Sequence, residues 1–494
     1  MAATQSSRPA ASLSAAPSFW TKTAYGFGTV APGITETGFN YFLLIFYSQV
    51  VGLDPRLVGL AITASLMIDA FVDPVVGYWS DNLRSRWGRR HPFMYASAIP
   101  LAVGYLLLWM PPRGWSQASL FWYLLLLGIA IRICTTFYET PSSALAPELS
   151  HDYDERASLL GYRLFFGWSG GNVMTVLMFL VIFPAAVTAT IANGQFNPAA
   201  YATYGVVAAA LIFVAIVVSA IGTQSGVAGM SLAPPKRGLT IGKIFAEMVQ
   251  TLADRSFIAL FAAAMFGAIA TGLAASLSFY FTTFFWGFTS AQIGIIVIGV
   301  FASAALGAGL APAVSRRLGK KRGAMIIGLV AILGAPLPIV LRLFDVLPPN
   351  GDPLVFWFVA ATNTLDTALI ICFQTLTAAM IADLVDQSEL RTGRRSEGVF
   401  FAAVTFVRKT VLGLGLIAAS LILTLAHFPA GAKQGQVPPA TLFQLGAYYV
   451  PAILTLWLGM MAMLSRYRLE RGDHEANLRK LIERRAAPAS MLTT

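Results

Sequence analysis

The sequence predicts an all-α membrane protein, and three observations support this fold class. The chain of 494 residues is 56% hydrophobic and only 12% charged, whereas soluble domains average about 25% charge. Its mean hydropathy is +0.68. Apolar runs long enough to cross about 30 Å of hydrocarbon recur along the chain. A soluble protein of this size cannot hide so much apolar surface, because the buried fraction grows slowly with length.

The apolar runs predict twelve transmembrane helices, divided six and six. The predicted spans are 23–50, 56–80, 92–111, 118–147, 159–186, 200–222, 256–288, 291–313, 323–343, 353–384, 398–427 and 442–465. The longest connection, 223–255, contains glycine and proline and separates the two sets. We therefore predict six-helix bundles over 21–222 and 256–465, with a disordered tail over 1–20 and a second tail over 466–494.

A weak internal repeat indicates that the two bundles are related. A basic, glycine-punctuated cluster follows the second helix of each half, at 86–90 and at 315–322. Duplicated halves are typical of secondary transporters, whose substrate site lies between the halves near the middle of the membrane. The sequence therefore favours a transporter that works by alternating access.

Basic residues set the predicted orientation in the membrane. We number the loops along the chain, so that loop one follows the first predicted span. The even-numbered loops carry seventeen lysines and arginines, whereas the odd-numbered loops carry four. Loops rich in lysine and arginine remain in the cytoplasm. We therefore expect the even loops and both termini to be cytoplasmic, in a multi-pass protein of the cell inner membrane.

Composition and motifs argue against several other function classes. The net charge of +11 is carried by these short loops and tails, which argues against nucleic-acid binding. No glycine-rich phosphate loop occurs, which argues against direct ATP drive. The histidines lie in loops or at helix ends, at His91, His151, His427 and His474. We expect a monomer without enzyme activity, and no cofactor other than a coupling ion.

Ionisable residues inside the predicted spans are the candidate functional groups. A charge at the bilayer centre costs at least about 2.5 kcal/mol, so such residues face the bundle interior or a water-filled cavity. The residues are Glu36, Asp69, Asp73, Arg132, Glu139, Arg163, Asp366, Arg408 and Lys409. Each except Arg408 is interpreted as part of a substrate or ion pathway, with a structural role as the alternative. Arg408 points about 100° away from Lys409 on the helix and is expected to snorkel or to pair elsewhere.

Asp69 and Asp73 form the clearest pattern. Their i, i+4 spacing puts both carboxylates on one face of the second helix. Two anions there repel each other, so either a cation lies between them or at least one is protonated. Carboxylate oxygens suit hard cations. The pattern predicts a coupling-ion site for Na⁺ or H⁺, and the alternative is a helix-end pair that is solvated at the cytoplasmic surface.

Helices four and one supply further candidates. Arg132 and Glu139 lie two turns apart on one face, so an ion pair between them is geometrically open. Glu36 is one turn before Asn40, after a stretch broken by glycine and proline. We interpret Arg132, Glu139, Glu36 and Asn40 as solute contacts. The alternatives are a structural Arg132–Glu139 pair and a bracing role for Glu36.

Three more charges are predicted to contact the solute. Lys409 on helix eleven is an ammonium group from the opposite half, and it can pair with carboxylates across the cavity. Asp366 lies near the middle of helix ten, and Arg163 opens helix five. The alternative for Lys409 is a static salt bridge between the halves, and for Arg163 an interfacial position.

Seven short segments carry a family resemblance. In the first half they are Tyr25-Gly-Phe-Gly28, Tyr47-Ser-Gln-Val-Val-Gly-Leu53, Asp69-Ala-Phe-Val-Asp73-Pro74-Val-Val-Gly77 and Ser85-Arg-Trp-Gly-Arg-Arg-His-Pro-Phe93. In the second half they are Met380-Ile-Ala-Asp383-Leu-Val-Asp386, Arg395-Ser-Glu-Gly398 and Val407-Arg-Lys409. In this order they resemble the glycoside-pentoside-hexuronide:cation symporters, the melibiose-permease-like branch of the major facilitator superfamily.

The resemblance implies the major facilitator fold and cation-coupled symport of a sugar or glycoside. It implies that Asp69 and Asp73 bind the coupling cation and that the helix-four hydroxyl of Thr136 assists them. A helix-four aspartate of the family contacts the sugar, and its place is held here by Glu139. The family's helix-eleven lysine is matched by Lys409, and its arginine at the start of helix five by Arg163.

Two departures from the family pattern affect specificity. The family's sugar-binding aspartate on helix one falls on Gly33, and Glu36 one turn later is the candidate substitute. The tryptophan that stacks on galactosides falls on Ser143. Both losses argue against a galactoside. The same branch resembles lysolipid carriers, so the alternative is a cation-dependent transporter of lysophospholipids or other amphiphiles. A second rival is a membrane sensor that binds its ligand without transporting it.

Overall fold

The described part of the chain is helical nearly throughout. A computed structural model describes residues 17–83, 85–150, 152–224, 255–392 and 397–466. Over 381–410 only the backbone is described. Within these ranges no β-strand occurs, and ten helices are long and apolar enough to cross a membrane. The predicted all-α membrane fold is therefore confirmed.

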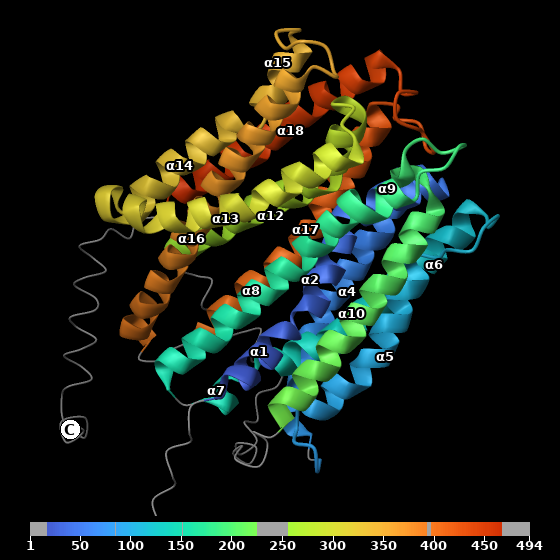
Figure 1. The fold of residues 1–494 in the computed structure, drawn as a ribbon. Helices are drawn as coiled ribbons and strands as arrows, with labels where there is room; N and C mark the ends of the chain where they lie inside the picture. The colour runs from blue at the N-terminus through green and yellow to red at the C-terminus, as the bar shows by residue number, and fades with distance from the viewer. Residues whose placement is uncertain (1–16, 84, 151, 225–254, 393–396, 467–494) are drawn as a thin grey trace, which may run out of the picture.

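The two halves of the chain occupy different parts of the molecule. The first half is blue to green in Figure 1, and the second half is yellow to red, above and to its left. The first crossing consists of α1 (Phe19–Phe27), α2 (Val30–Thr37), η1 (Gly38–Phe42), α3 (Leu43–Ile45) and η2 (Phe46–Val51). The rest of the first half consists of α4 (Pro55–Asn82), α5 (His91–Leu108), α6 (Gln117–Ser143), α7 (Ala146–Leu149), α8 (Tyr153–Leu177), η3 (Met178–Ile182), α9 (Phe183–Ala185), η4 (Gly194–Phe196) and α10 (Pro198–Gln224).

The second half repeats the six-crossing arrangement. Its elements are α12 (Arg255–Tyr280), η6 (Phe281–Phe285), α13 (Ser290–Leu318), α14 (Lys320–Gly334), α15 (Leu337–Leu343), α16 (Pro353–Thr392), α17 (Glu397–Leu425) and α18 (Pro439–Ser465). The ninth crossing changes direction between α14 and α15 at Pro336, which cannot continue the hydrogen-bond ladder of a helix.

The first crossing has an irregular helical backbone. Two π-helical stretches, η1 and η2, interrupt it, and such stretches are frequent at functional sites. It also approaches α8 closely, because a Cβ atom built on Gly33 would lie 2.0 Å from the carbonyl oxygen of Gly167. Only glycine fits this crossing point, so the backbone contact fixes the rotation of α2 and with it the direction of Glu36.

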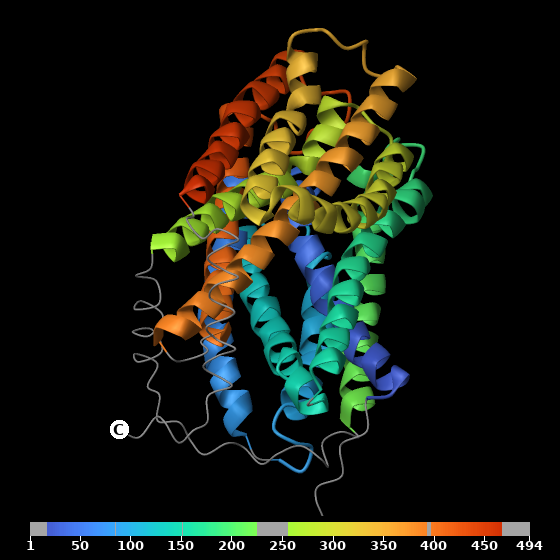
Figure 2. The same ribbon diagram turned by 90° about the vertical axis from the view of Figure 1, so that its left-hand side faces the viewer.

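The two halves pack together along several helices. Helix α4 lies along α6 within the first half and along α17 of the second half. Helix α12 contacts η1, and α13 contacts α8. Figure 2 shows the second half seated above the first, with α17 running down beside the blue helices. Helix α4 is therefore placed where one face meets its own bundle and another meets the opposite half.

Hydrogen bonds between the halves gather at the end of the molecule that carries the odd-numbered loops, which we call the odd-loop end. The hydroxyl groups of Ser48 and Tyr280 are hydrogen-bonded, and the Gln49 amide donates to Tyr280 at 3.3 Å. The backbone N–H of Ala432 donates to Gln49 at 2.9 Å. Ser48, Gln49 and Tyr280 are all buried. We call Ser48, Gln49, Tyr280 and Ala432 the seal, since they join the first half to the second.

Further contacts close the same end. Thr283 donates to Gln195 at 2.9 Å, and Asn193 donates to Gln434 at 2.7 Å. A ring cluster lies beneath them, in which Phe279 of the second half is 4.8 Å from the ring of Phe42. The described structure is thus held shut between the halves at the odd-loop end.

The seal predicts a measurable effect of Tyr280→Phe. Removing the hydroxyl leaves the buried Ser48 and Gln49 without that partner, which costs about 1–3 kcal/mol in the shut state. We expect hydrogen–deuterium exchange over 46–51 and 429–435 to rise about tenfold, the equivalent of roughly 1.4 kcal/mol. Tyr448→Phe is the matched control, because Tyr448 is 41% exposed. Equal exchange in both variants would show that the seal does not hold this end.

Candidate cation and solute site

Helices α4 and α6 bring two carboxylates and a hydroxyl together. The Thr136 hydroxyl lies 2.7 Å from Asp69 Oδ1 and 2.9 Å from Asp73 Oδ1. Thr140, one turn further along α6, lies 3.5 Å from the same oxygen of Asp73. The i, i+4 spacing on each helix produces this arrangement, because both pairs project from one face. Thr140 was missed by the sequence analysis, although its spacing from Thr136 contained the signal.

The site lies deep in the membrane-spanning region. Asp69 is close to the midpoint of α4, and it is only 1% exposed. Asp73 is half-buried. Thr136 is 1% exposed and lies past the midpoint of α6. This burial does not match the alternative of an acid pair solvated at a helix end, since Asp69 has little contact with solvent.

Arg132 lies beside these acids. Its Nη1 atom is hydrogen-bonded to Glu36 Oε1 and lies 4.0 Å from Asp69 Oδ2. The guanidinium side chain is 1% exposed and is stacked 4.2 Å above the centre of the Phe39 ring. Its close ion pair is therefore with helix one. The spacing on α6 left Glu139 open as a partner of Arg132, and Glu139 also acts on Arg132 electrostatically.

Glu36 and Asn40 form the more accessible side of this network. The Asn40 amide donates to Glu36 Oε2 at 3.3 Å, as their spacing predicts. The Glu36 side chain is 39% exposed, whereas Asp69 beyond Arg132 is buried. A single guanidinium thus lies between the buried Asp69 and a carboxylate that other molecules can reach.

The other predicted residues are less closely joined to this network. Arg163 donates to the Ser142 hydroxyl at 3.1 Å and lies over the ring of Tyr25. Asp366 lies within the second half, where its Oδ1 atom is 3.7 Å from a Cβ position built on Gly334. Lys409 belongs to α17, and its side chain lies outside the described residues.

The structure gives a reason for one departure from the family pattern. At Gly33 the backbone of α8 leaves no room for a side chain, so an aspartate cannot occupy that position here. Glu36 lies three residues later and carries its carboxylate to Arg132 instead. Ser143, at the second departure, lies exposed at the end of α6 and donates to the Thr140 carbonyl.

The donor set suits a small hard cation. Two carboxylates and a hydroxyl offer oxygen ligands, which Na⁺ prefers, and the same carboxylates can hold a proton. Within the described ranges, no three side chains of His, Cys, Asp or Glu gather as a metal site. The arrangement therefore depends on the two acids together with hydroxyl oxygen.

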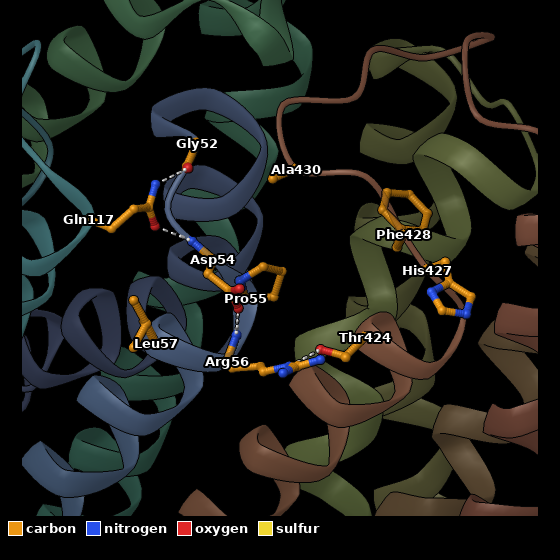
Figure 3. Close-up of a pocket in the computed structure, with 10 residues that line it drawn as sticks. All are labelled: Gly52, Asp54, Pro55, Arg56, Leu57, Gln117, Thr424, His427, Phe428 and Ala430. Atoms are coloured by element: carbon orange, nitrogen blue, oxygen red, sulfur yellow. Dashed lines mark hydrogen bonds between the residues drawn. The ribbon is translucent and has the colours of Figure 1, made fainter.

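A separate pocket lies at the odd-loop end, between the halves. It has a volume of about 580 Å³, and its lining is labelled in Figure 3. Arg56 at its floor donates through Nε to the Thr424 hydroxyl at 3.0 Å, which links α4 to α17. None of the predicted site residues lines it. The pocket is thus part of the junction between the halves at the odd-loop end rather than of the Asp69 site.

Comparisons with known proteins agree with this architecture. A model of the family described as MFS/sugar transport protein matches residues 24–471. A putative glycoside/cation symporter of Escherichia coli is 25% identical, over 94% of this chain and 95% of that protein. A sodium-dependent lysophosphatidylcholine symporter of Danio rerio is 33% identical, but over only 29% of this chain and 27% of that protein.

Solved structures share the fold at low sequence identity. A bacterial homolog of the human lysosomal transporter Spinster, solved in an inward-facing and unoccupied conformation, superposes with a TM-score of 0.60. It covers 95% of this chain and 98% of that chain at 14% identity. The likeness shows that the chain shares the fold of that transporter.

Proposed function

Because the chain belongs to the MFS/sugar transport family, we propose that it carries a sugar or glycoside across the membrane together with a cation. The observation that carries the proposal is the meeting of Asp69, Asp73 and Thr136 in the middle of the first half. A cation there offsets the repulsion between the two neighbouring carboxylates. Full-length similarity to a glycoside/cation symporter supports the solute class.

In this mechanism the two halves alternate around a central solute. Glu36, Asn40 and Glu139 offer acceptors and a donor to sugar hydroxyls, and Arg132 positions Glu36. The cation is held by Asp69 and Asp73, so an empty cation site leaves an uncompensated charge that opposes closure. Lys409 and Arg163 are proposed to contact the solute as the family resemblance implies, and Asp366 is proposed as a cavity residue.

The proposed orientation places the even-numbered loops and both termini in the cytoplasm, because those loops hold most of the lysines and arginines. In that orientation the odd-loop end faces outward. The seal at Tyr280 then closes the outer side of the described structure. We propose that a monomer is sufficient, since both halves of the site come from one chain.

Uptake into proteoliposomes tests the function directly. The purified chain is offered a panel of labelled glycosides and sugars, and separately lysophosphatidylcholine, under an inward Na⁺ gradient, an inward H⁺ gradient or no gradient. We expect at least one glycoside to accumulate above equilibrium under one cation gradient, and an ionophore to abolish the accumulation. Cation-driven uptake of lysophosphatidylcholine with no glycoside transported would contradict the proposed solute class. Binding without uptake or counterflow would instead identify a sensor.

A further inference from the structure

Arg132 has an unusual electrostatic position in the described structure. It is one of the largest fully buried side chains, and its Nη1 atom is within ion-pair distance of both Glu36 and Asp69. Its Nε and Nη2 atoms have no hydrogen-bond partner among the described residues. A buried guanidinium with unsatisfied N–H groups is costly. The arrangement therefore retains capacity for a different set of acceptors in another state.

We propose that Arg132 is an internal competitor of the coupling cation, exchanging between Glu36 when the cation is bound and Asp69 when it is absent. The inference rests on the proposed cation site at Asp69 and Asp73. With no cation present, the charge of Asp69 in a low-dielectric interior attracts the guanidinium 4.0 Å away. When the cation binds, it neutralises the charge of Asp69, so Asp69 no longer attracts the guanidinium and Arg132 stays paired with Glu36.

This exchange links the ion site to the solute site. Glu36 is shared by Arg132 and Asn40 and is the exposed member of the network. Retention of Arg132 by Glu36 fixes the direction of this carboxylate, whereas departure of Arg132 releases it. Cation binding therefore prepares the surface that meets the solute. By thermodynamic reciprocity, solute bound at Glu36 strengthens cation binding by the same factor.

Three carboxylates, those of Glu36, Asp69 and Glu139, act electrostatically on Arg132. Helix α6 contributes Glu139 in addition to Arg132, and α2 contributes Glu36. Helix α17 packs against α4 and carries Arg408 and Lys409, whose side chains lie outside the described residues. Arg132 contributes a cationic group 4.0 Å from Asp69 Oδ2.

The test uses two variants that break the same ion pair from opposite sides. Na⁺ is titrated into the detergent-purified full chain with choline balancing ionic strength, and binding is followed by the shift in thermal unfolding. A unit charge about 4 Å from a ligand oxygen shifts ion affinity by about tenfold or more at an intermediate dielectric constant. We expect Arg132→Gln to lower the half-saturating Na⁺ concentration about tenfold and Glu36→Gln to raise it about tenfold.

Opposite shifts separate this role from a structural one. If the pair only braces helix one against α6, both variants weaken Na⁺ binding in the same direction or leave it unchanged, and the inference is overturned. Arg132→Lys keeps the charge and is expected to stay close to wild type. Unfolding temperatures measured without Na⁺ identify variants that fail to fold. Glu36→Asp keeps the negative charge that pairs with Arg132, and it is therefore expected to shift Na⁺ binding less than Glu36→Gln does.

The proposed function can fail separately. If Na⁺ does not shift the unfolding temperature of the wild-type chain, the proposed competition between Arg132 and the cation is overturned. Proton-driven glycoside uptake is then tested separately by the proteoliposome assay. If Na⁺ binds and Asp69→Asn abolishes binding but the two variants shift together, only the role of Arg132 is wrong.

Discussion

Asp69→Asn is expected to abolish concentrative uptake while leaving the protein folded in the membrane. The change removes an ionised ligand but keeps the shape of the side chain and its contact with Thr136. Loss of one charged ligand from a buried site removes about 3 kcal/mol of cation binding, which corresponds to roughly a hundredfold in affinity. Accumulation of the transported glycoside in proteoliposomes under the productive cation gradient measures the effect.

A matched control tests whether the effect belongs to the site. Asp345→Asn changes the same side chain at an exposed position between α15 and α16, where Asn tolerates the positive φ of 55°. We expect this variant to accumulate solute as the wild type does. Exchange of solute across the membrane without a gradient is also measured, since Asp69→Asn should affect coupling more than solute exchange. Unimpaired accumulation by Asp69→Asn would remove Asp69 from the mechanism.

Gly33→Ala is expected to prevent stable packing of helix one. The added Cβ atom would lie 2.0 Å from the Gly167 carbonyl, and backbone cannot move aside as a flexible side chain can. Overpacking of this kind costs about 3 kcal/mol or more when rigid helices must separate. We expect loss of monodisperse protein in detergent and a large fall in unfolding temperature, measured on a fluorescent fusion by size-exclusion chromatography.

Gly161→Ala on α8 is the control for that prediction. A Cβ atom there meets nothing within 4 Å, and alanine is favoured over glycine in helices by up to about 1 kcal/mol. The same chemical change is thus expected to be neutral or stabilising at Gly161 and strongly destabilising at Gly33. Equal behaviour of the two variants would contradict the close crossing of α2 and α8.

Hydrophobic run lengths were sufficient to predict the helical membrane fold, since each crossing must satisfy its own backbone hydrogen bonds in lipid. The irregular first crossing could not be predicted in detail. Its glycines and Pro32 indicated a break, but the division into α1, α2 and two π-helical stretches depends on contacts with α8 and α12. These are tertiary contacts that local sequence does not specify.

The candidate site was only partly predictable for a similar reason. Spacing on α4 and α6 fixes which residues share a face, so the approach of Thr136 to Asp69 follows once the helices pack. The partner of Arg132 does not follow from spacing. Glu139 shares its helix, yet the close ion pair is with Glu36, because the crossing at Gly33 sets the rotation of helix one.

The seal also lay beyond the sequence analysis. Ser48, Gln49 and Tyr280 are ordinary polar residues near helix ends, and nothing in their spacing identifies partners more than two hundred positions apart. Their pairing belongs to one conformational state of two halves that move, and a sequence pattern records no single state.

The most direct measurement is cation flux driven by the solute. Proteoliposomes that hold the transported glycoside at high concentration are diluted without any cation gradient, and movement of Na⁺ or H⁺ is followed. If Asp69 and Asp73 hold the transported cation, the wild-type chain moves the cation outward with the glycoside, and Asp73→Asn releases glycoside without cation movement. Cation flux of wild-type size in Asp73→Asn would contradict the account.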